Sequence, residues 1–299
     1  MLRLFTPAFS VLAATLLLAC TPQERTVAQS QWDDTWQTAP QPRLSAGCSV
    51  SNQPLAPATV TVRGQQRSFI SRVPQYYAPG MPHDLVIAFH GRTNPNTRVR
   101  GYYELDEALP MAIIAYPSAS RFESGFRWSD PGDAVAELRD FELFDALVEA
   151  FSGSFCVDLD RVFVVGHSLG ASFANSVACH RGATVRAVAS VAGGIEGREC
   201  DGGAAALLIH HPDDLLVPLS EGIRVRNEFI AANGLELAPS PTSEPDLTAL
   251  GCVRYGSGSL NPVVWCVHDQ ATTIGGRYYP HNWPNATPRA IARFFADLP

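Results

Sequence analysis

The stretch that decides the fold is Val162-Phe163-Val164-Val165-Gly166-His167-Ser168-Leu169-Gly170, in which an apolar run leads directly into a glycine-flanked serine. The small residues at 171–179 favour a helix immediately after this turn. Glycines on both sides of Ser168 leave room for a strained strand-to-helix turn that lifts the hydroxyl above the sheet edge. We therefore predict that Ser168 is a nucleophile. The alternative is a serine that only caps the helix.

Short apolar runs rich in Val, Ile and Ala recur on both sides of this stretch. They cover residues 85–89, 111–115, 185–191 and 205–209. Strands that are apolar on both faces are typical of a parallel sheet covered by helices on both sides. Helical patterns at 134–151, 171–179 and 220–232 would supply these covering layers.

The two ends of the domain carry further signals. Runs at 59–62 and 69–73 flank Arg63-Gly64-Gln65-Gln66 and predict an antiparallel hairpin. Near the C-terminus, Thr287 is predicted to cap a last helix, with Pro288 at its first position. An antiparallel start followed by alternating strands and helices is the order of the α/β-hydrolase fold. We expect one α/β catalytic domain over residues 48–299.

The N-terminus predicts export. Residues 1–19 combine a short cationic start with an apolar segment too short to span a bilayer, as in a signal peptide. Leu17-Leu18-Ala19-Cys20 resembles the lipobox of bacterial lipoproteins, which predicts an acylated Cys20 and a membrane-anchored protein facing the periplasm or cell exterior. The alternative is an ordinary signal with an incidental cysteine. Residues 20–47, rich in Gln, Thr, Ser, Pro and Ala, are expected to form a flexible tether.

Cysteine parity agrees with an oxidising compartment. Apart from Cys20 the chain has six cysteines, an even number that predicts three disulfides. Of the 15 possible pairings, the one we expect closes loops of modest length: Cys48–Cys156, Cys179–Cys200 and Cys252–Cys266. No Cys-x-x-Cys pair or His-Cys cluster at zinc spacing occurs, so we expect no metal.

Charge excludes some partners. The formal net charge is −7 with 22 Lys and Arg, which argues against nucleic acid and against electrostatic binding to anionic lipid. We expect a monomer without a cofactor, held at the membrane by its lipid anchor alone.

A serine nucleophile needs a base, and the base needs an orienting carboxylate. The apolar run 205–209 leads into Asp213 and Asp214, and an acid just past the end of a strand would lie at the catalytic edge of the sheet. We favour Asp214, with Asp213 as a solvated turn residue. The alternative is that both only cap the loop.

Two histidines remain as candidates for the base. The other six precede the acid or lie too near it in sequence: His83, His90, His167, His180, His210 and His211. His268 ends the apolar run 263–267, whereas His281 lies in a loop before the last helix, where this fold presents its base. We predict that His281 is the base.

The tetrahedral intermediate also needs donors for its oxyanion. The N–H of Leu169 follows the nucleophile and is predicted to be one donor. Phe89-His90-Gly91-Arg92-Thr93 follows an early strand, and Gly91 permits close backbone approach. We choose the Arg92 N–H as the second donor, with Thr93 in reserve. His90 is expected to support this loop by hydrogen bonding.

Taken together, these motifs carry a family resemblance. Phe89-His90-Gly91, the Gly166 to Gly170 motif, the 209–218 segment and His281-x-Trp283-Pro284 resemble the secreted polyhydroxybutyrate depolymerase and feruloyl esterase family. The resemblance implies hydrolysis of carboxylic esters, either of a polyester or of phenolic acids. Two departures, His211 and Pro280 where the family usually has Gly, leave the triad intact and affect the substrate pocket.

Two tryptophans could line an apolar slot for the acyl group. Trp283 follows the predicted base by two residues, and Trp128 lies in a glycine-containing loop. For Trp128 a place in the core is an equally good interpretation. Besides an esterase, the sequence allows a serine peptidase on the same fold, although it shows no added domain or basic pocket for a peptide. A non-catalytic binding lipoprotein is disfavoured because every triad role has a candidate.

Overall fold

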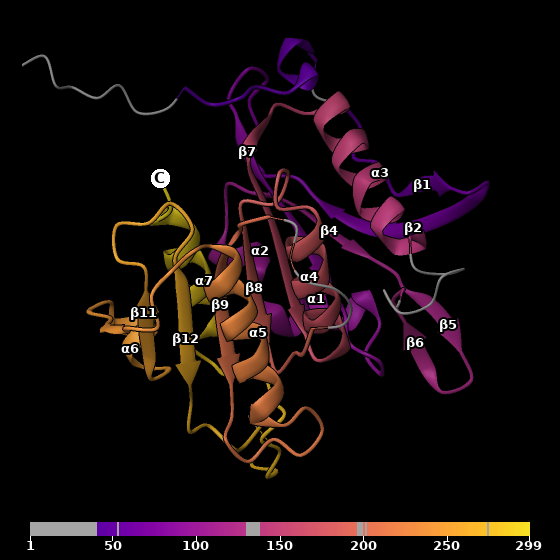
Figure 1. Ribbon diagram of the computed structural model, residues 1–299. Helices are drawn as coiled ribbons and strands as arrows, with labels where there is room; N and C mark the ends of the chain where they lie inside the picture. The colour runs from indigo at the N-terminus through magenta and orange to yellow at the C-terminus, as the bar shows by residue number, and fades with distance from the viewer. Residues whose placement is uncertain (1–40, 53, 130–137, 196–199, 201, 274) are drawn as a thin grey trace, which may run out of the picture. The chain divides into compact units, whose positions relative to one another are not determined.

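The computed structural model describes residues 41–299 except 53, 130–137, 196–199, 201 and 274. In this part of the chain, ten strands form one sheet in the order β1-β2-β4-β3-β7-β8-β9-β12-β11-β10 (Figure 1). The strands are β1 Thr59–Val62, β2 Gln65–Arg72, β3 His83–Phe89, β4 Ile113–Pro117, β7 Val157–His167, β8 Ala187–Val191, β9 Ala205–His210, β10 Ser240–Pro241, β11 Cys252–Tyr255 and β12 Val263–Val267. A separate hairpin consists of β5 Ser120–Phe122 and β6 Gly125–Arg127.

The centre of the sheet is parallel and its two edges are antiparallel. Strands β4, β3, β7, β8, β9 and β12 pair in parallel. Strands β1 and β2 at one edge, and β10 and β11 at the other, pair antiparallel. The predicted α/β-hydrolase fold is therefore confirmed.

Helices cover both faces of the sheet. They are α1 Asn96–Tyr103, α2 Leu105–Ala108, α3 Arg139–Ser154, α4 Leu169–His180, α5 Leu219–Ala232, α6 Pro245–Thr248 and α7 Thr287–Ala296, with a 3-10 turn at Ala46–Ser49. Side chains of α3, α4 and α5 share one hydrophobic cluster, and those of α1, α2, α6 and α7 share another; α5 lies in front of the sheet and α7 behind it in Figure 1. In β3, Leu85, Ile87 and Phe89 join the first cluster whereas Val86 and Ala88 join the second. This alternation explains why the central strands are apolar throughout.

Several predicted boundaries move by a few residues. The hairpin turn is only Arg63-Gly64, with φ of 50° and 77°, because a two-residue turn of this kind matches the twist of the strands. Thr287 is not the cap of the last helix. It is the first helical residue, after Ala286 as the cap, and its N–H already donates to the Pro284 carbonyl at 3.0 Å. The residue is fully buried.

The folded domain begins before Cys48, so the predicted tether of residues 20–47 is too long at its C-terminal end. Leu44 forms an antiparallel bridge with Asp158, and the Ser45 N–H donates to the Val157 carbonyl at 3.0 Å. These backbone bonds add a short strand-like segment beside β7. The predicted signal peptide and Cys20 lie outside the described residues.

The three predicted disulfides are all present. Cys48–Cys156 spans 108 residues and ties the N-terminal segment to the start of β7, and Cys179–Cys200 spans 21. Cys252 and Cys266 face each other across β11 and β12, so the third disulfide crosslinks neighbouring strands. Within the described part of the chain, no helix is both long and apolar enough to cross a membrane.

Candidate active site

Ser168 occupies a strained turn between β7 and α4. Its backbone has φ 59° and ψ −128°, which is unusual for a residue with a side chain. A Cβ on Gly166 would collide with the backbone of Gly170, and a Cβ on Gly170 would collide with the Phe89 carbonyl. Both positions of the motif therefore require glycine. Strain of this kind is typical of a functional turn that presents a nucleophile.

The structure brings Ser168, His281 and Asp214 together from three separate segments. His281 Nε2 lies 2.7 Å from Ser168 Oγ, and His281 Nδ1 lies 2.6 Å from Asp214 Oδ2. His281 follows β12 in the loop before α7, and Asp214 follows β9. Because β7, β9 and β12 belong to the parallel part of the sheet, the segments after them meet at its carboxyl edge.

Asp214 uses both of its carboxylate oxygens. While Oδ2 bonds His281, Oδ1 accepts the N–H groups of Leu216 and Val217 at 2.9 and 3.0 Å. Burial alone would raise the pKa of Asp214, but the bonds from His281 and these backbone groups hold it below its ordinary value. Asp213 is exposed, and its N–H donates to His211 Nδ1 at 3.0 Å. The geometry thus separates the two aspartates that the sequence left in competition.

His268 lies apart from this arrangement. Its ring packs against His211 with centroids 5.1 Å apart, and its backbone N–H donates to the His210 carbonyl at 3.1 Å. Burial, followed by the charges of His211 and His210, lowers the pKa of His268 to about 4. Its environment therefore keeps the ring neutral at ordinary pH.

His167 is a residue near the triad that sequence reasoning discounted. Its Nδ1 lies 3.1 Å from the Tyr102 hydroxyl, and its ring lies 5.1 Å from that of His281. Burial and the nearby His281 lower the pKa of His167 to about 3, so the ring that packs beside His281 is neutral. Its position directly before Ser168 was the available signal, but its partner Tyr102 is distant in sequence.

Ser168 opens into a cavity of about 390 Å³. Its wall includes Leu216 and Val217, which follow Asp214 in the loop after β9, here called the acid loop, together with Tyr102 and Tyr279. The other lining residues are Gly91, Arg92, Thr93, Asn94, His167, Leu169, Ser172 and His281. A second cavity of about 630 Å³ shares Asn94, Tyr102, His167 and Tyr279 with the first. The two cavities are therefore adjoining parts of one cleft, with Ser168 in the smaller part.

The two predicted substrate-binding tryptophans have different positions. Trp283 lines the second cavity, where its ring stacks on Tyr103 with centroids 4.2 Å apart. Neither tryptophan lines the cavity of Ser168, so the prediction that they form the acyl slot is corrected, and Trp128 lines neither cavity. It is buried, stacks on Phe173 at 5.2 Å and donates from Nε1 to the His90 carbonyl at 2.8 Å. A bulky ring with an internal hydrogen-bond partner is more stable there than in a solvated cleft.

The predicted oxyanion loop passes directly over the nucleophile. A Cβ on Gly91 would lie 3.4 Å from Ser168 Cβ, and both Arg92 and Leu169 line the cavity with Ser168. The carbonyl of Arg92 accepts the Phe126 N–H at 2.8 Å, so β6 holds this loop from the side. Among the described residues, no three His, Cys, Asp or Glu side chains are grouped so that they could hold a metal ion.

Known proteins resemble this chain in sequence. Feruloyl esterase C of Emericella nidulans is 31% identical over 214 residues, which cover 68% of this chain and 75% of the relative. Feruloyl esterase D of Neurospora crassa is 27% identical over 254 residues, covering 80% and 84%. No family model matches the chain.

Solved structures resemble it in fold. The Bacillus cereus carboxylesterase has a TM-score of 0.54 at 13% identity, covering 78% of this chain and 94% of that one. The acetyl xylan esterase of Aspergillus awamori has a TM-score of 0.52 at 17% identity, covering 67% and 87%. At such identities the likeness supports the fold, and the sequence relatives supply the family. The chain belongs to the feruloyl esterase and polyhydroxybutyrate depolymerase-like family of α/β-hydrolases and is a serine carboxylic ester hydrolase.

Proposed function

We propose that this enzyme hydrolyses esters of phenolic acids through an acyl-enzyme on Ser168, with His281 as base and Asp214 as its orienting acid. The observation that carries the proposal is the unbroken hydrogen-bond chain from Asp214 through His281 to Ser168, which ends at an open cavity. The relatives named feruloyl esterases favour a phenolic acyl group over other esters.

In the acylation step, Ser168 Oγ attacks the ester carbonyl carbon while its proton passes to His281 Nε2. Asp214 accepts the Nδ1–H bond and stabilises the imidazolium that forms. The carbonyl oxygen becomes an oxyanion that the N–H groups of Leu169 and Arg92 stabilise. When the intermediate collapses, the bond to the alcohol oxygen breaks, His281 returns the proton to that oxygen, and the alcohol leaves.

Deacylation repeats the sequence with water in place of the serine. His281 takes a proton from water as its oxygen attacks the acyl carbon, and the second oxyanion uses the same donors. Collapse breaks the bond to Ser168 Oγ, which regains the proton from His281. The products are the free acid and the regenerated serine.

The cleft has room for both halves of such an ester. The cavity of about 390 Å³ beside Ser168 has an apolar side formed by Leu216 and Val217, which suits an aromatic acyl group. The adjoining cavity of about 630 Å³, where Trp283 lies, would take the alcohol part. Tyr102 and Tyr279 lie at the boundary between the two.

Two measurements test the proposal. Ser168→Ala should fold normally and lose nearly all esterase activity, keeping only the weak catalysis of the oxyanion donors. Activity of this variant within tenfold of the parent would rule out Ser168 as the nucleophile. In a panel of methyl ferulate, hydroxybutyrate oligomers and short aryl esters, kcat/KM should be highest for methyl ferulate. A preference for the oligomers would assign the enzyme to polyester instead.

We further propose that the mature protein is a monomer anchored to a membrane through an acylated Cys20. The three disulfides support an oxidising compartment, and the lipobox-like sequence before Cys20 supports acylation. Expression of Cys20→Ser should release a soluble, active enzyme, which fractionation and light scattering would detect. Retention of this variant in the membrane fraction would contradict the anchor.

A further inference from the structure

The loop after β3 presents three consecutive carbonyl groups, and each accepts a hydrogen bond. Trp128 Nε1 donates to the His90 carbonyl at 2.8 Å, and the Phe126 N–H donates to the Arg92 carbonyl at 2.8 Å. Between them, the Gly91 carbonyl lies 2.8 Å from His90 Nδ1. A peptide whose carbonyl is bonded cannot rotate without losing that bond, so all three peptides of this loop are fixed.

The bonding of His90 assigns its tautomer. The Ala119 N–H donates to His90 Nε2 at 3.0 Å, so Nε2 has a lone pair and the ring proton is on Nδ1. Nδ1–H therefore donates to the Gly91 carbonyl. Burial also lowers the pKa of His90, which favours this neutral form.

The Gly91–Arg92 peptide is the unit that matters for catalysis. None of the described peptide bonds is cis, and in a trans peptide the C=O and N–H point in opposite directions. Since the Gly91 carbonyl faces His90, the Arg92 N–H faces the other side. A flipped peptide would instead present its carbonyl oxygen on that side, where it would repel a developing oxyanion.

We propose that His90 is a positioning residue that locks the Gly91–Arg92 peptide with its N–H directed at the ester oxyanion. The oxyanion hole, formed by the N–H groups of Leu169 and Arg92, is therefore in place before substrate binds. This inference rests on the proposed roles of Ser168 and Arg92, and it assigns to His90 a task distinct from proton transfer.

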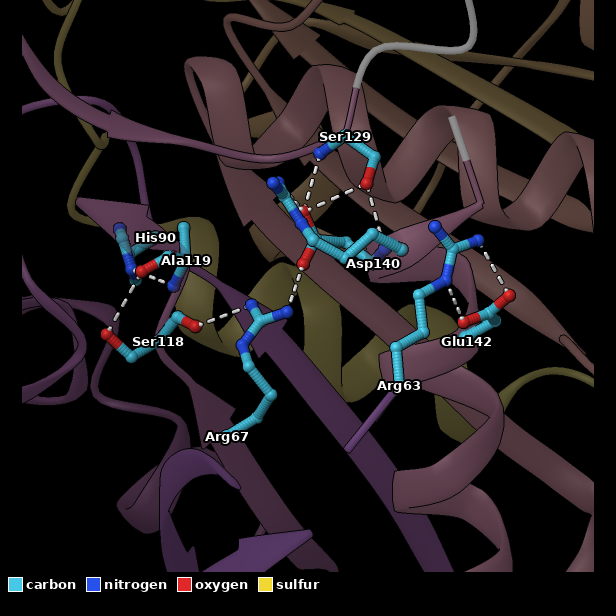
Figure 2. Close-up of polar contacts among 9 residues, drawn as sticks. Arg63, Arg67, His90, Ser118, Ala119, Ser129, Asp140 and Glu142 are labelled. Carbon is cyan, nitrogen blue, oxygen red and sulfur yellow. Dashed lines mark hydrogen bonds and ion pairs between the residues drawn. The ribbon is translucent and has the colours of Figure 1, made fainter. Parts of the chain in front are cut away.

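A buried ion pair holds the partner of His90 in place. Figure 2 shows Arg67 between Asp140 and Ser118: Nη1 lies 2.7 Å from Asp140 Oδ1, and Nη2 donates to the Ser118 carbonyl at 3.0 Å. The residue after Ser118 is Ala119, whose N–H bonds His90. Asp140 is fully buried and also accepts Arg139 at 2.6 Å and the Ser129 N–H at 2.6 Å. The hydrogen bond from Ala119 to His90 is thus connected, through Ser118, to the buried ion pair between Arg67 on β2 and Asp140 on α3.

Three substitutions at His90 separate the lock from simple packing. His90→Phe keeps a ring against Phe126 and Trp128 but removes both hydrogen bonds. His90→Asn keeps a donor near the Nδ1 position, and His90→Gln keeps an acceptor near the Nε2 position. Steady-state kinetics with p-nitrophenyl acetate give kcat and KM, and thermal melts report folding.

We expect kcat to depend on whether the variant keeps a hydrogen-bond donor to the Gly91 carbonyl. His90→Phe and His90→Gln should lose on the order of 10²-fold in kcat with little change in KM, as for loss of an oxyanion donor. His90→Asn should stay within about tenfold of the parent. Affinity for a boronic acid, which forms a tetrahedral adduct on the serine, should fall in parallel with kcat/KM.

A matched variant controls for the loss of a buried hydrogen bond. Trp128→Phe removes the donor to the neighbouring His90 carbonyl and should lower Tm similarly with a smaller loss of kcat. The proposal is overturned if folded His90→Phe keeps the parent kcat and boronate affinity. It is also overturned if the kcat of His90→Phe exceeds that of His90→Asn. If His90→Phe does not fold, the kcat values of His90→Asn and His90→Gln decide. A kcat of His90→Gln equal to or above that of His90→Asn would overturn the proposal. Failure of the Ser168 assignment would show separately, as a parent enzyme insensitive to the boronic acid and an active Ser168→Ala.

Discussion

Two carboxylates with almost no exposed surface, Asp214 and Asp140, are held by opposite kinds of partner. Asp140 lies between the guanidinium groups of Arg67 and Arg139, so fixed positive charges surround it. Asp214 instead bonds a histidine and two backbone N–H groups. For both, burial alone would raise the pKa, and the partners hold it below the ordinary value.

The difference teaches what each arrangement can do. An arginine keeps its proton at any ordinary pH, so the Asp140 cluster is a permanent ion pair that fixes β2, α3 and the segment at Ser118. A histidine can gain and lose a proton near neutral pH, so the Asp214 pair can respond when Ser168 gives up its proton. One buried carboxylate thus serves stability and the other is suited to chemistry.

The largest expected effect comes from Asp214→Asn. The amide oxygen can still accept the backbone N–H groups of the acid loop, but the amide can hold His281 in the wrong tautomer. We expect kcat to fall on the order of 10³ to 10⁴-fold, with Tm close to that of the parent. Asp213→Asn is the matched control and should change kcat little, because Asp213 is exposed. Reversed results would move the acid role to Asp213.

Asp140→Asn should act on stability rather than turnover. It leaves Arg67 and Arg139 without a buried counter-charge, which we expect to cost about 3–5 kcal/mol and to lower Tm on the order of 10 °C. Below the melting transition, kcat should fall less than tenfold. Calorimetry and p-nitrophenyl acetate kinetics measure the two effects.

Glu142→Gln provides the comparison on the same helix. Glu142 pairs with Arg63 at 2.7 Å, visible beside the Asp140 cluster in Figure 2, but both side chains are exposed. Exposed pairs contribute little, so Tm should hardly change. Equal losses of Tm for Asp140→Asn and Glu142→Gln would contradict the stabilising role of the buried cluster.

Most of the fold could be predicted from local sequence patterns. Val162 to Gly170 specified the strand, the turn and the helix because strand and helix patterns meet at two glycines whose neighbours leave no room for a Cβ. That the six cysteines form disulfides was also predictable, since the predicted export signal and an even cysteine count imply pairing. Thr287 was misplaced by one position because helix starts depend on backbone bonds that sequence does not specify.

Long-range contacts explain what the sequence could not predict. Trp128 was predicted to line the pocket because it lies in a glycine-containing loop, yet it is buried in the core and its Nε1 donates to the His90 carbonyl. The neighbouring bond from the Phe126 N–H to the Arg92 carbonyl requires Gly125, where a Cβ would lie 2.6 Å from that carbonyl oxygen, a contact between segments far apart along the chain. Leu216 was missed as a cavity residue, although its place two residues after Asp214 was a usable signal.

A further expected effect, on pH dependence, is a difference in acid sensitivity between the two carboxylate regions. Near Asp214, the folded pKa of His268 is about 4, below the value of about 6.5 in an unfolded chain. The unfolded state therefore binds more protons as pH falls below 6.5, and the stability present above that pH is lost progressively toward pH 4. His268 should account for a loss of about 2 kcal/mol between pH 8 and pH 5. Among the described residues, the charged partners of Asp140 are Arg67 and Arg139, which keep their protons throughout this pH range. The stabilising effect of Asp140 is therefore lost only as the pH falls from the ordinary aspartate pKa toward the lowered pKa of the folded state.

Urea unfolding at both pH values tests this difference in the parent and in His268→Phe, which keeps a ring against His211. The variant should lose less free energy of unfolding than the parent between pH 8 and pH 5. Hydrogen exchange at pH 5 should show faster opening around β9 and β12 than around α3, because the titrating rings lie on the Asp214 side. Equal losses in the two proteins would mean that His268 is not the group that titrates. Faster opening of α3 would reverse the comparison, because it would make the arginine-held cluster the weaker of the two in acid.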